Sequence, residues 1–96
     1  MPKIKDLPED QRPREKLLKF GPESLSDKEL LAILIGHGIK GKSAIEMAEE
    51  LLSEYKDIKG LAGKRLDEFM KMKGIKEAKI IKIAVAFEIA KRIYFT

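Results

Sequence analysis

Lysine side chains gather around one glycine in residues 72–79, a combination that suits the binding of an anion. Positive charges at a helix start are unfavourable by about 0.3–1 kcal/mol each unless an anion compensates them, and Glu77 is the only acid in this stretch. Free backbone N–H groups at a helix start favour the same ligand. We hypothesise that a nucleic-acid phosphate supplies the negative charge; the alternative is a solvated basic turn. The predicted DNA-contacting residues are Lys73, Gly74, Ile75, Lys76, Lys79 and Lys82.

The apolar pattern on both sides of Gly74 predicts the helices that must position these lysines. Apolar residues recur at helical spacing between 66 and 72, and again from Ile75 into a longer helix expected at 77–94. About five residues between two helices allow only a tight turn, and glycine tolerates the positive φ that such a turn needs. The sequence therefore predicts a helical hairpin, with Ile75 holding its turn to the core. Further candidates for flanking contacts are Lys64 and Arg65.

The charge distribution favours the same face. The 96-residue chain has a formal net charge of +4, but residues 64–92 carry nine Lys or Arg against four Asp or Glu, an excess of five positive charges. The rest of the chain has eleven against twelve and is nearly neutral. A nucleic-acid-binding face requires such a local excess of positive charge.

Composition argues against several other classes of function. With no cysteine and one histidine, the sequence lacks the usual ligands of a zinc site, so we predict no metal and no cofactor. No run approaches the ~20 apolar residues of a membrane span, and the first residues lack the apolar core of a signal peptide. We expect a cytoplasmic protein without a membrane partner. No nucleophile is paired with His37, so no catalytic residue is assigned and the protein is not expected to be an enzyme.

Helix start and stop signals predict an all-α fold. Pro13 suits the first position of a helix that ends at Gly21, and capping-box patterns at 26–29 and 43–46 open two more helices. The expected helices span 13–20, 27–35, 44–55, 66–72 and 77–94, with a short turn of helix at 58–62. We predict an extended N-terminal lead-in at 1–12 and one helical domain at 13–96, a small bundle of about five helices. Because the last helix is apolar on most sides, we expect it to cross the middle of the bundle.

A second basic loop, residues 36–43, matches the GxxxxGK[ST] pattern of nucleotide-binding phosphate loops. That loop belongs after a strand of a parallel sheet, and this chain offers no second strand, so nucleotide hydrolysis is not expected. The loop still leads into a capped helix start, where lysines and N–H groups can hold a phosphate. The alternative is that Ser43 only caps the helix and the lysines are solvated. The predicted second phosphate site comprises Gly38, Lys40, Gly41, Lys42 and Ser43.

Three separated blocks, followed by the hairpin at 72–78, resemble the N-terminal domain of the RadC family. The blocks are DLPEDQRPREKLL at 6–18, SLSDKELLAIL at 24–34 and GIKGKS at 38–43. The hairpin is similar to the helix-hairpin-helix motif, which implies that backbone N–H groups hold DNA phosphates without reading sequence. The resemblance also implies that longer members continue into a metallopeptidase-like domain with paired histidines, which these residues are expected to lack.

Together these features predict a non-enzymatic domain that binds duplex or branched DNA through backbone phosphates, and the resemblance implies a role in DNA repair or recombination. The alternative function is a protein-interaction module that docks a separate catalytic domain or another protein partner. Two features favour the alternative: Lys76 stands where the hairpin motif usually has a second glycine, and the net charge is modest. An exposed apolar patch near Tyr94 and Phe95 would also favour it.

Overall fold

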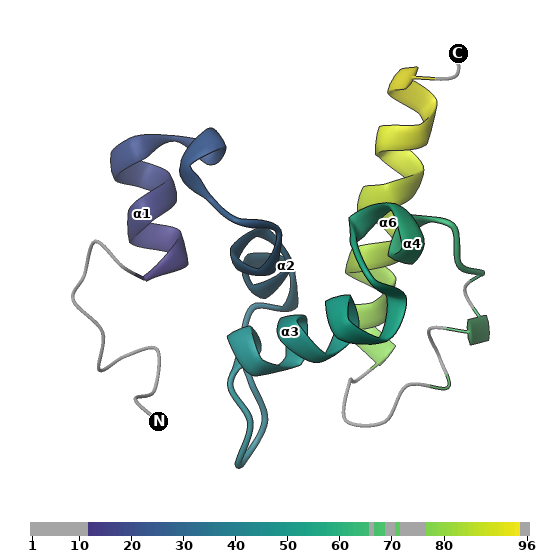
Figure 1. Ribbon diagram of the computed structural model, residues 1–96, viewed down its shortest axis with the longest axis horizontal. Helices are drawn as coiled ribbons and strands as arrows, with labels where there is room; N and C mark the ends of the chain where they lie inside the picture. The colour runs from purple at the N-terminus through teal and green to yellow at the C-terminus, as the bar shows by residue number, and fades with distance from the viewer. Residues whose placement is uncertain (1–11, 66, 69–70, 72–76, 95–96) are drawn as a thin grey trace.

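The computed structural model describes residues 12–65, 67–68, 71 and 77–94, and within these ranges the fold is all-α (Figure 1). The helices are α1 (Pro13–Phe20), the 3-10 helix η3 (Pro22–Ser24), α2 (Asp27–Ile35), α3 (Ala44–Tyr55), α4 (Ile58–Ala62) and α6 (Glu77–Tyr94). These bounds confirm the predicted fold class and the helical segments expected at 13–20, 27–35, 44–55, 58–62 and 77–94, while the helix expected at 66–72 lies largely outside the described residues. The lead-in at 1–12, Arg12 apart, and the hairpin turn at 72–76 lie outside the described residues and stay predictions.

Capping boxes fix the starts of α2 and α3, as the sequence predicts. The Glu29 N–H donates to Ser26 Oγ at 3.2 Å, and the Ser26 N–H donates to Glu29 Oε1 at 2.9 Å. Ser43 and Glu46 exchange the same pair of hydrogen bonds, at 3.1 and 3.2 Å. Each box provides acceptors for two backbone N–H groups that would otherwise be hydrogen-bonded only to water. The starts of both helices are therefore stabilised by contacts within a few residues, which do not depend on tertiary packing.

Helix α1 is short and is tied to α2 by an ion pair. It begins with Pro13 and ends at Gly21, whose φ of +87° is a conformation that glycine adopts without strain. Lys16 Nζ lies 3.1 Å from Glu29 Oε1, so the carboxylate that closes the α2 capping box also holds α1. The position of α1 thus depends on the same residue that starts α2.

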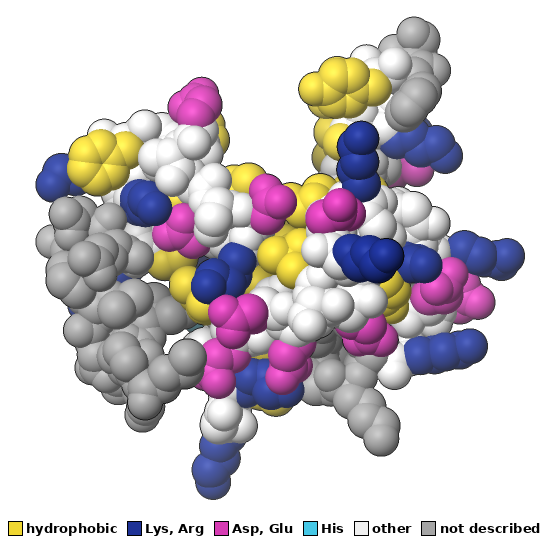
Figure 2. Space-filling model, viewed as in Figure 1, with side chains coloured by type: hydrophobic (Ala, Val, Ile, Leu, Met, Phe, Trp, Pro, Cys, Tyr) yellow, Lys and Arg dark blue, Asp and Glu magenta, His cyan; other side chains and the backbone are white. Residues whose placement is uncertain are grey.

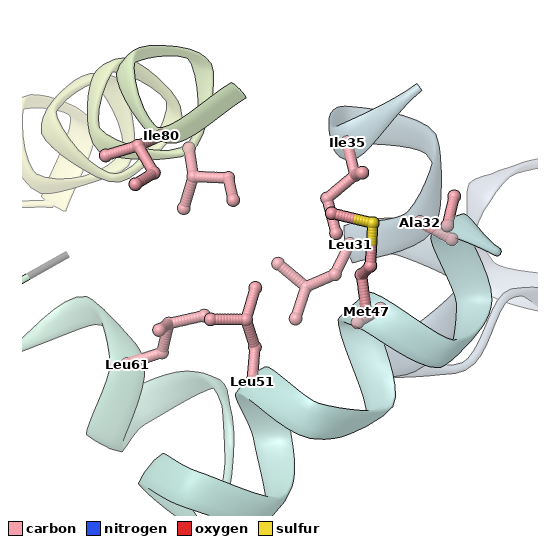
Figure 3. Packing of buried hydrophobic residues seen from close by; sticks show 10 residues of the cluster. Leu31, Ala32, Ile35, Met47, Leu51, Leu61 and Ile80 are labelled. Atoms are coloured by element: carbon pink, nitrogen blue, oxygen red, sulfur yellow. The ribbon is translucent and has the colours of Figure 1, made fainter. Parts of the chain in front are cut away.

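The core lies between α2 and α3, and α4 and α6 add further buried side chains (Figure 3). Helix α4 adds Leu61, which is fully buried, and the first half of α6 adds Ile80 and Ile83. The buried cluster comprises Leu31, Ala32, Ile35, Ala44, Met47, Ala48, Leu51, Leu61, Ile80 and Ile83. Burying these apolar side chains is the main force that holds α2, α3, α4 and α6 together.

The expectation that the last helix crosses the middle of the bundle is wrong. Ile80 and Ile83, both in the first half of α6, are its buried residues, and Figure 1 shows the second half extending beyond the other helices. Ile89 and Ile93 are 56% and 69% exposed. The helix is apolar on two faces, but the α2–α3 pair is large enough to cover only one of them. The apolar composition of α6 therefore predicted a more complete burial of this helix than the described residues provide.

Candidate nucleic-acid interface

The basic loop between α2 and α3 folds back on itself as a tight turn. Ile39 and Lys42 exchange backbone hydrogen bonds of 2.9 and 3.0 Å, which leaves Lys40 and Gly41 at the tip. Gly41 has a φ of +84°, as the third position of a type II turn requires. At Gly38, a Cβ atom would lie 2.2 Å from the Lys42 carbonyl oxygen. Both glycines are thus needed for the path of the chain, whether or not the loop holds a ligand.

The setting of this loop differs from that of a nucleotide-binding phosphate loop. The apolar run before it is helix α2, and the described part of the chain contains no strand, only an isolated bridge between Ile39 and Lys42. A phosphate loop needs a preceding strand that belongs to a parallel sheet. The sequence pattern therefore occurs here without the architecture that gives it that function.

The side chains of the predicted second phosphate site are partly engaged within the protein. Lys42 Nζ lies 2.8 Å from Glu50 Oε2, and Ser43 Oγ caps α3. Lys40 is exposed and forms no ion pair with a described residue. Of the two lysines in this loop, Lys40 is the one whose charge is not offset by a carboxylate. The tip of the turn is consequently the part of the loop best suited to an external anion.

Two arginines that the sequence analysis did not assign to the site lie beside this loop. Arg12 and Arg14, at the start of α1, line an open groove of about 830 Å³ together with His37, Lys40 and Lys42. The packing of α1 against α2 brings them there from more than 20 residues away in sequence. Arg12 lies 3.9 Å from Glu15. No local pattern in the sequence signals this meeting, because it depends on how α1 is placed.

Lys79 brings the two predicted sites next to each other. Its Nζ donates a hydrogen bond of 2.9 Å to the carbonyl of Ile35 and a second, shorter one to the carbonyl of His37. These are carbonyls at the end of α2, where a cation is favourable. The first turn of α6 is thereby fastened to the start of the basic loop. A phosphate contact by Lys79 stays a prediction, and such a phosphate would compete with these carbonyls.

The other predicted contacts divide into two groups. Lys82 is exposed and forms no ion pair with a described residue, and Lys64 lies over the Tyr55 ring at 5.4 Å from its centroid. Arg65 pairs with Asp67 at 3.3 Å. The remaining predicted hairpin residues, Lys73, Gly74, Ile75 and Lys76, lie outside the described residues. Their contacts with DNA stay predictions.

Positive charges are neutralised differently in the two parts of the molecule. In the part formed by α1–α3, ion pairs connect different helices. Examples are Lys16–Glu29 at 3.1 Å between Nζ and Oε1 and Lys28–Glu49 at 3.0 Å between Nζ and Oε2. In residues 64–94, the ion pairs among described residues are local, at Arg65–Asp67 and Arg92–Glu88. The lysines of this segment for which the ion pairs give no carboxylate partner among the described residues include Lys64, Lys71, Lys82 and Lys91.

Glu29 and Tyr55 have shifted pKa values, and both belong to the structural framework. Burial raises the pKa of Glu29, but hydrogen bonds from the Ser26 N–H and from Lys16 lower it by more, so its pKa lies below the usual value. Burial, then the charges of Glu54 and Glu68, raises the pKa of Tyr55. Within the described ranges, no three His, Cys, Asp or Glu residues are grouped so as to hold a metal ion. None of the described helices is long and apolar enough to span a membrane.

The described chain is all-helical. The basic loop at the end of α2 lies next to the start of the basic helix α6, where Lys79 joins them. Residues 4–81 match the family described as UPF0758 N-terminal, and the chain belongs to that family. It is 48% identical over 89 residues to a UPF0758 protein of Alteromonas mediterranea and 47% identical over 92 residues to one of Carboxydothermus hydrogenoformans. These matches cover 93% and 96% of this chain but 40% and 41% of the relatives. No solved structure matches the chain.

Proposed function

We propose that this domain binds DNA without sequence specificity and without enzymatic activity, through backbone phosphates on the basic segment 64–92. The observation that carries the proposal is the set of lysines in this segment that no described carboxylate neutralises, among them Lys64, Lys71, Lys82 and Lys91. Phosphates offset such charges and displace counterions, which makes binding favourable. Lysine and N–H contacts to phosphate carry little sequence information, so shape decides between duplex and branched DNA.

The basic loop at 36–43 extends this proposed face. Lys79 fastens α6 beside the loop, and the groove next to it contains Arg14 and Lys40. A DNA backbone lying along the first turn of α6 would therefore meet further cations at the basic loop. The resemblance to the RadC N-terminal domain supports a role in DNA repair or recombination, with the metallopeptidase-like domain elsewhere in longer proteins.

Fluorescence anisotropy with duplex, branched and single-stranded DNA at several salt concentrations tests the proposal. If the face holds about three phosphates, log affinity falls with log salt at a slope of roughly −3 on duplex. Replacing two of the cations in Lys76→Gln/Lys82→Gln should bring the slope to roughly −1. Lys79 is left in place because it holds α2 carbonyls.

The matched control is Lys19→Gln/Lys28→Gln, which removes the same charge from α1 and α2 and should keep the parent slope. Circular dichroism checks that each variant is folded. Absence of binding at low salt contradicts the proposal, and so does an equal loss of slope in both double variants, because the second result would reflect net charge and not a face.

A second candidate function is that of a docking module, and the exposed apolar residues of α6 favour it. Ile93 and Tyr94 are 69% and 81% exposed at the end of the helix. Large apolar side chains gathered on one exposed element are typical of interaction sites. The exposed apolar residues share α6 with Lys82 and Lys91, so docking and DNA binding would use neighbouring positions of one helix.

A further inference from the structure

Helix α6 carries a second apolar face that no described residue covers. Ile81, Val85, Ile89 and Ile93 recur at every fourth position and are 47%, 51%, 56% and 69% exposed. Residues four apart form a continuous ridge on a helix, and twelve residues extend about 18 Å along its axis. We call these four residues the α6 stripe. Figure 2 shows a hydrophobic side chain exposed near the C-terminal end of the described chain.

The residue types of the stripe are unexpected for a face in water. All four are β-branched, and β-branched residues are weaker helix formers than the Lys, Glu or Ala usual at exposed positions. They do not serve the core, because Ile80 and Ile83 on the other side of α6 make those contacts. A helix that is apolar on two sides is usually buried on both. The stripe is therefore suited to packing against something beyond the described residues.

A second copy of this chain is a poor fit to the stripe. An antiparallel pairing that sets Ile81 against Ile93 also sets Lys82 of one copy against Arg92 of the other. Glu88 offers little relief, because it already pairs with Arg92 at 2.9 Å. A parallel pairing sets each cation against itself. Like charges next to an apolar contact oppose association, so the charges favour a partner with carboxylates at these positions.

The size of the stripe favours a partner in the same polypeptide. A ridge about 18 Å long on a helix about 10 Å wide covers far less than the roughly 800 Å² per partner of a standard independent complex. A tether supplies an effective concentration in the millimolar range, so a small contact is enough to dock a linked domain. The relatives supply such a link, since this chain spans about 40% of their length.

We propose that the α6 stripe docks the part of UPF0758 proteins that lies outside the segment matched by this chain. The docked surface is an apolar groove bordered by carboxylates that face Lys82 and Arg92. This inference rests on the second candidate function and names its partner; Lys82, which borders the α6 stripe, is also a proposed DNA contact, so the two functions meet at this residue. Docking gives α6 two roles: its first half closes the core of this domain, and its second half fixes the orientation of the next.

Amide hydrogen exchange tests the docking. The samples are this chain alone and a full-length chimera in which it replaces the matched segment of the Carboxydothermus hydrogenoformans relative. We expect amides of residues 85–94 to exchange at least tenfold more slowly in the chimera. Val85→Lys/Ile89→Lys should abolish that protection in the chimera, whereas the matched control Leu18→Lys, at an 86% exposed position on α1, should keep it.

Exchange of the α2–α3 amides in the same samples reports whether each variant is folded. The single variant Ile93→Lys, near the end of the helix, is a milder test of the same contact. Equal exchange of 85–94 in the chimera and in the isolated chain overturns the proposal and the docking function with it. Protection that appears in the isolated chain and rises with its concentration overturns the proposed partner alone, because a second copy then covers the stripe. In the isolated chain, Leu18→Lys, which lies outside segment 64–92, should leave the DNA salt slope close to that of the parent.

Discussion

Helices α3 and α6 are both rich in apolar residues but use them in different ways. Helix α3 has 12 residues and buries Ala44, Met47, Ala48 and Leu51, while α6 has 18 residues and buries two. The apolar residues of α3 form one stripe, which α2 and α4 cover. Those of α6 form two, and the described chain covers one. Apolar content alone therefore does not tell whether a helix is central to a fold.

The same two regions differ in their charges. Around α2 and α3, ion pairs such as Lys28–Glu49 connect one element with another. Around α6, pairs such as Arg92–Glu88 stay within one helix, and Lys82 has no carboxylate partner among the described residues. In the α2–α3 region, packing and ion pairs connect neighbouring elements, although Lys40 at the loop tip has no described carboxylate partner. The α6 region keeps one apolar face about half exposed and Lys82 without a described carboxylate partner, and this difference leads to four predictions.

The largest expected effect comes from truncating the α2–α3 core. Leu51→Ala should lower the free energy of unfolding by about 2–5 kcal/mol, because Leu51 is 1% exposed and its removal leaves a cavity. Ile89→Ala, at a 56% exposed position of α6, should change it by less than about 0.5 kcal/mol. Urea denaturation followed by circular dichroism measures both. Similar losses in the two variants would mean that the free half of α6 belongs to the core.

The next effect concerns the basic loop that joins α2 to α3. Gly38→Ala should cost roughly 1–3 kcal/mol, since its Cβ would meet the Lys42 carbonyl and the Ser43 backbone at less than 3 Å. The control Gly63→Ala has a φ of −80° and no atom nearer than 3.8 Å, and it should be nearly neutral. Thermal unfolding compares the pair. A neutral Gly38→Ala would show that the loop has room to move, which the close backbone approach denies.

A smaller effect is expected from the two capping boxes. Ser26→Ala and Ser43→Ala should each lower the free energy of unfolding by about 1 kcal/mol, because each removes the acceptor for an N–H at a helix start. Ser53→Ala, on the exposed side of α3, serves as the control and should be neutral or slightly stabilising. If Ser26→Ala proved much worse than Ser43→Ala, the additional Lys16–Glu29 contact would account for the difference.

The smallest effect is a pH dependence that belongs to the α1–α2 junction. The pKa of Glu29 is lowered in the folded protein, so its carboxylate stabilises the fold above the ordinary pKa of about 4.3. That stabilisation is lost as the pH falls below this value and through the lowered pKa. Glu29→Gln should therefore weaken the acid dependence of the unfolding free energy between about pH 5 and 3. An unchanged acid profile would remove Glu29 from this role.

Helices with their own start and stop signals could be predicted from the sequence. Pro13, Ser26 and Ser43 begin helices at the predicted positions, and Gly21 ends one, because capping and backbone preference act within a few residues. The sequence also determined that the segment around α6 has an excess of positive charge. The hairpin turn at 72–76, on which the predicted DNA contacts centre, lies outside the described residues, and those contacts stay predictions.

Tertiary structure alone decided where these elements meet. It placed Arg14 beside the basic loop, fastened Lys79 to the end of α2 and left Ile89 and Ile93 more than half exposed. The first two facts join residues more than 20 positions apart. Helical periodicity tells which side chains share a face, but the face that becomes buried depends on the area that the other helices can cover. For α6, that area is enough for one apolar face and not for two.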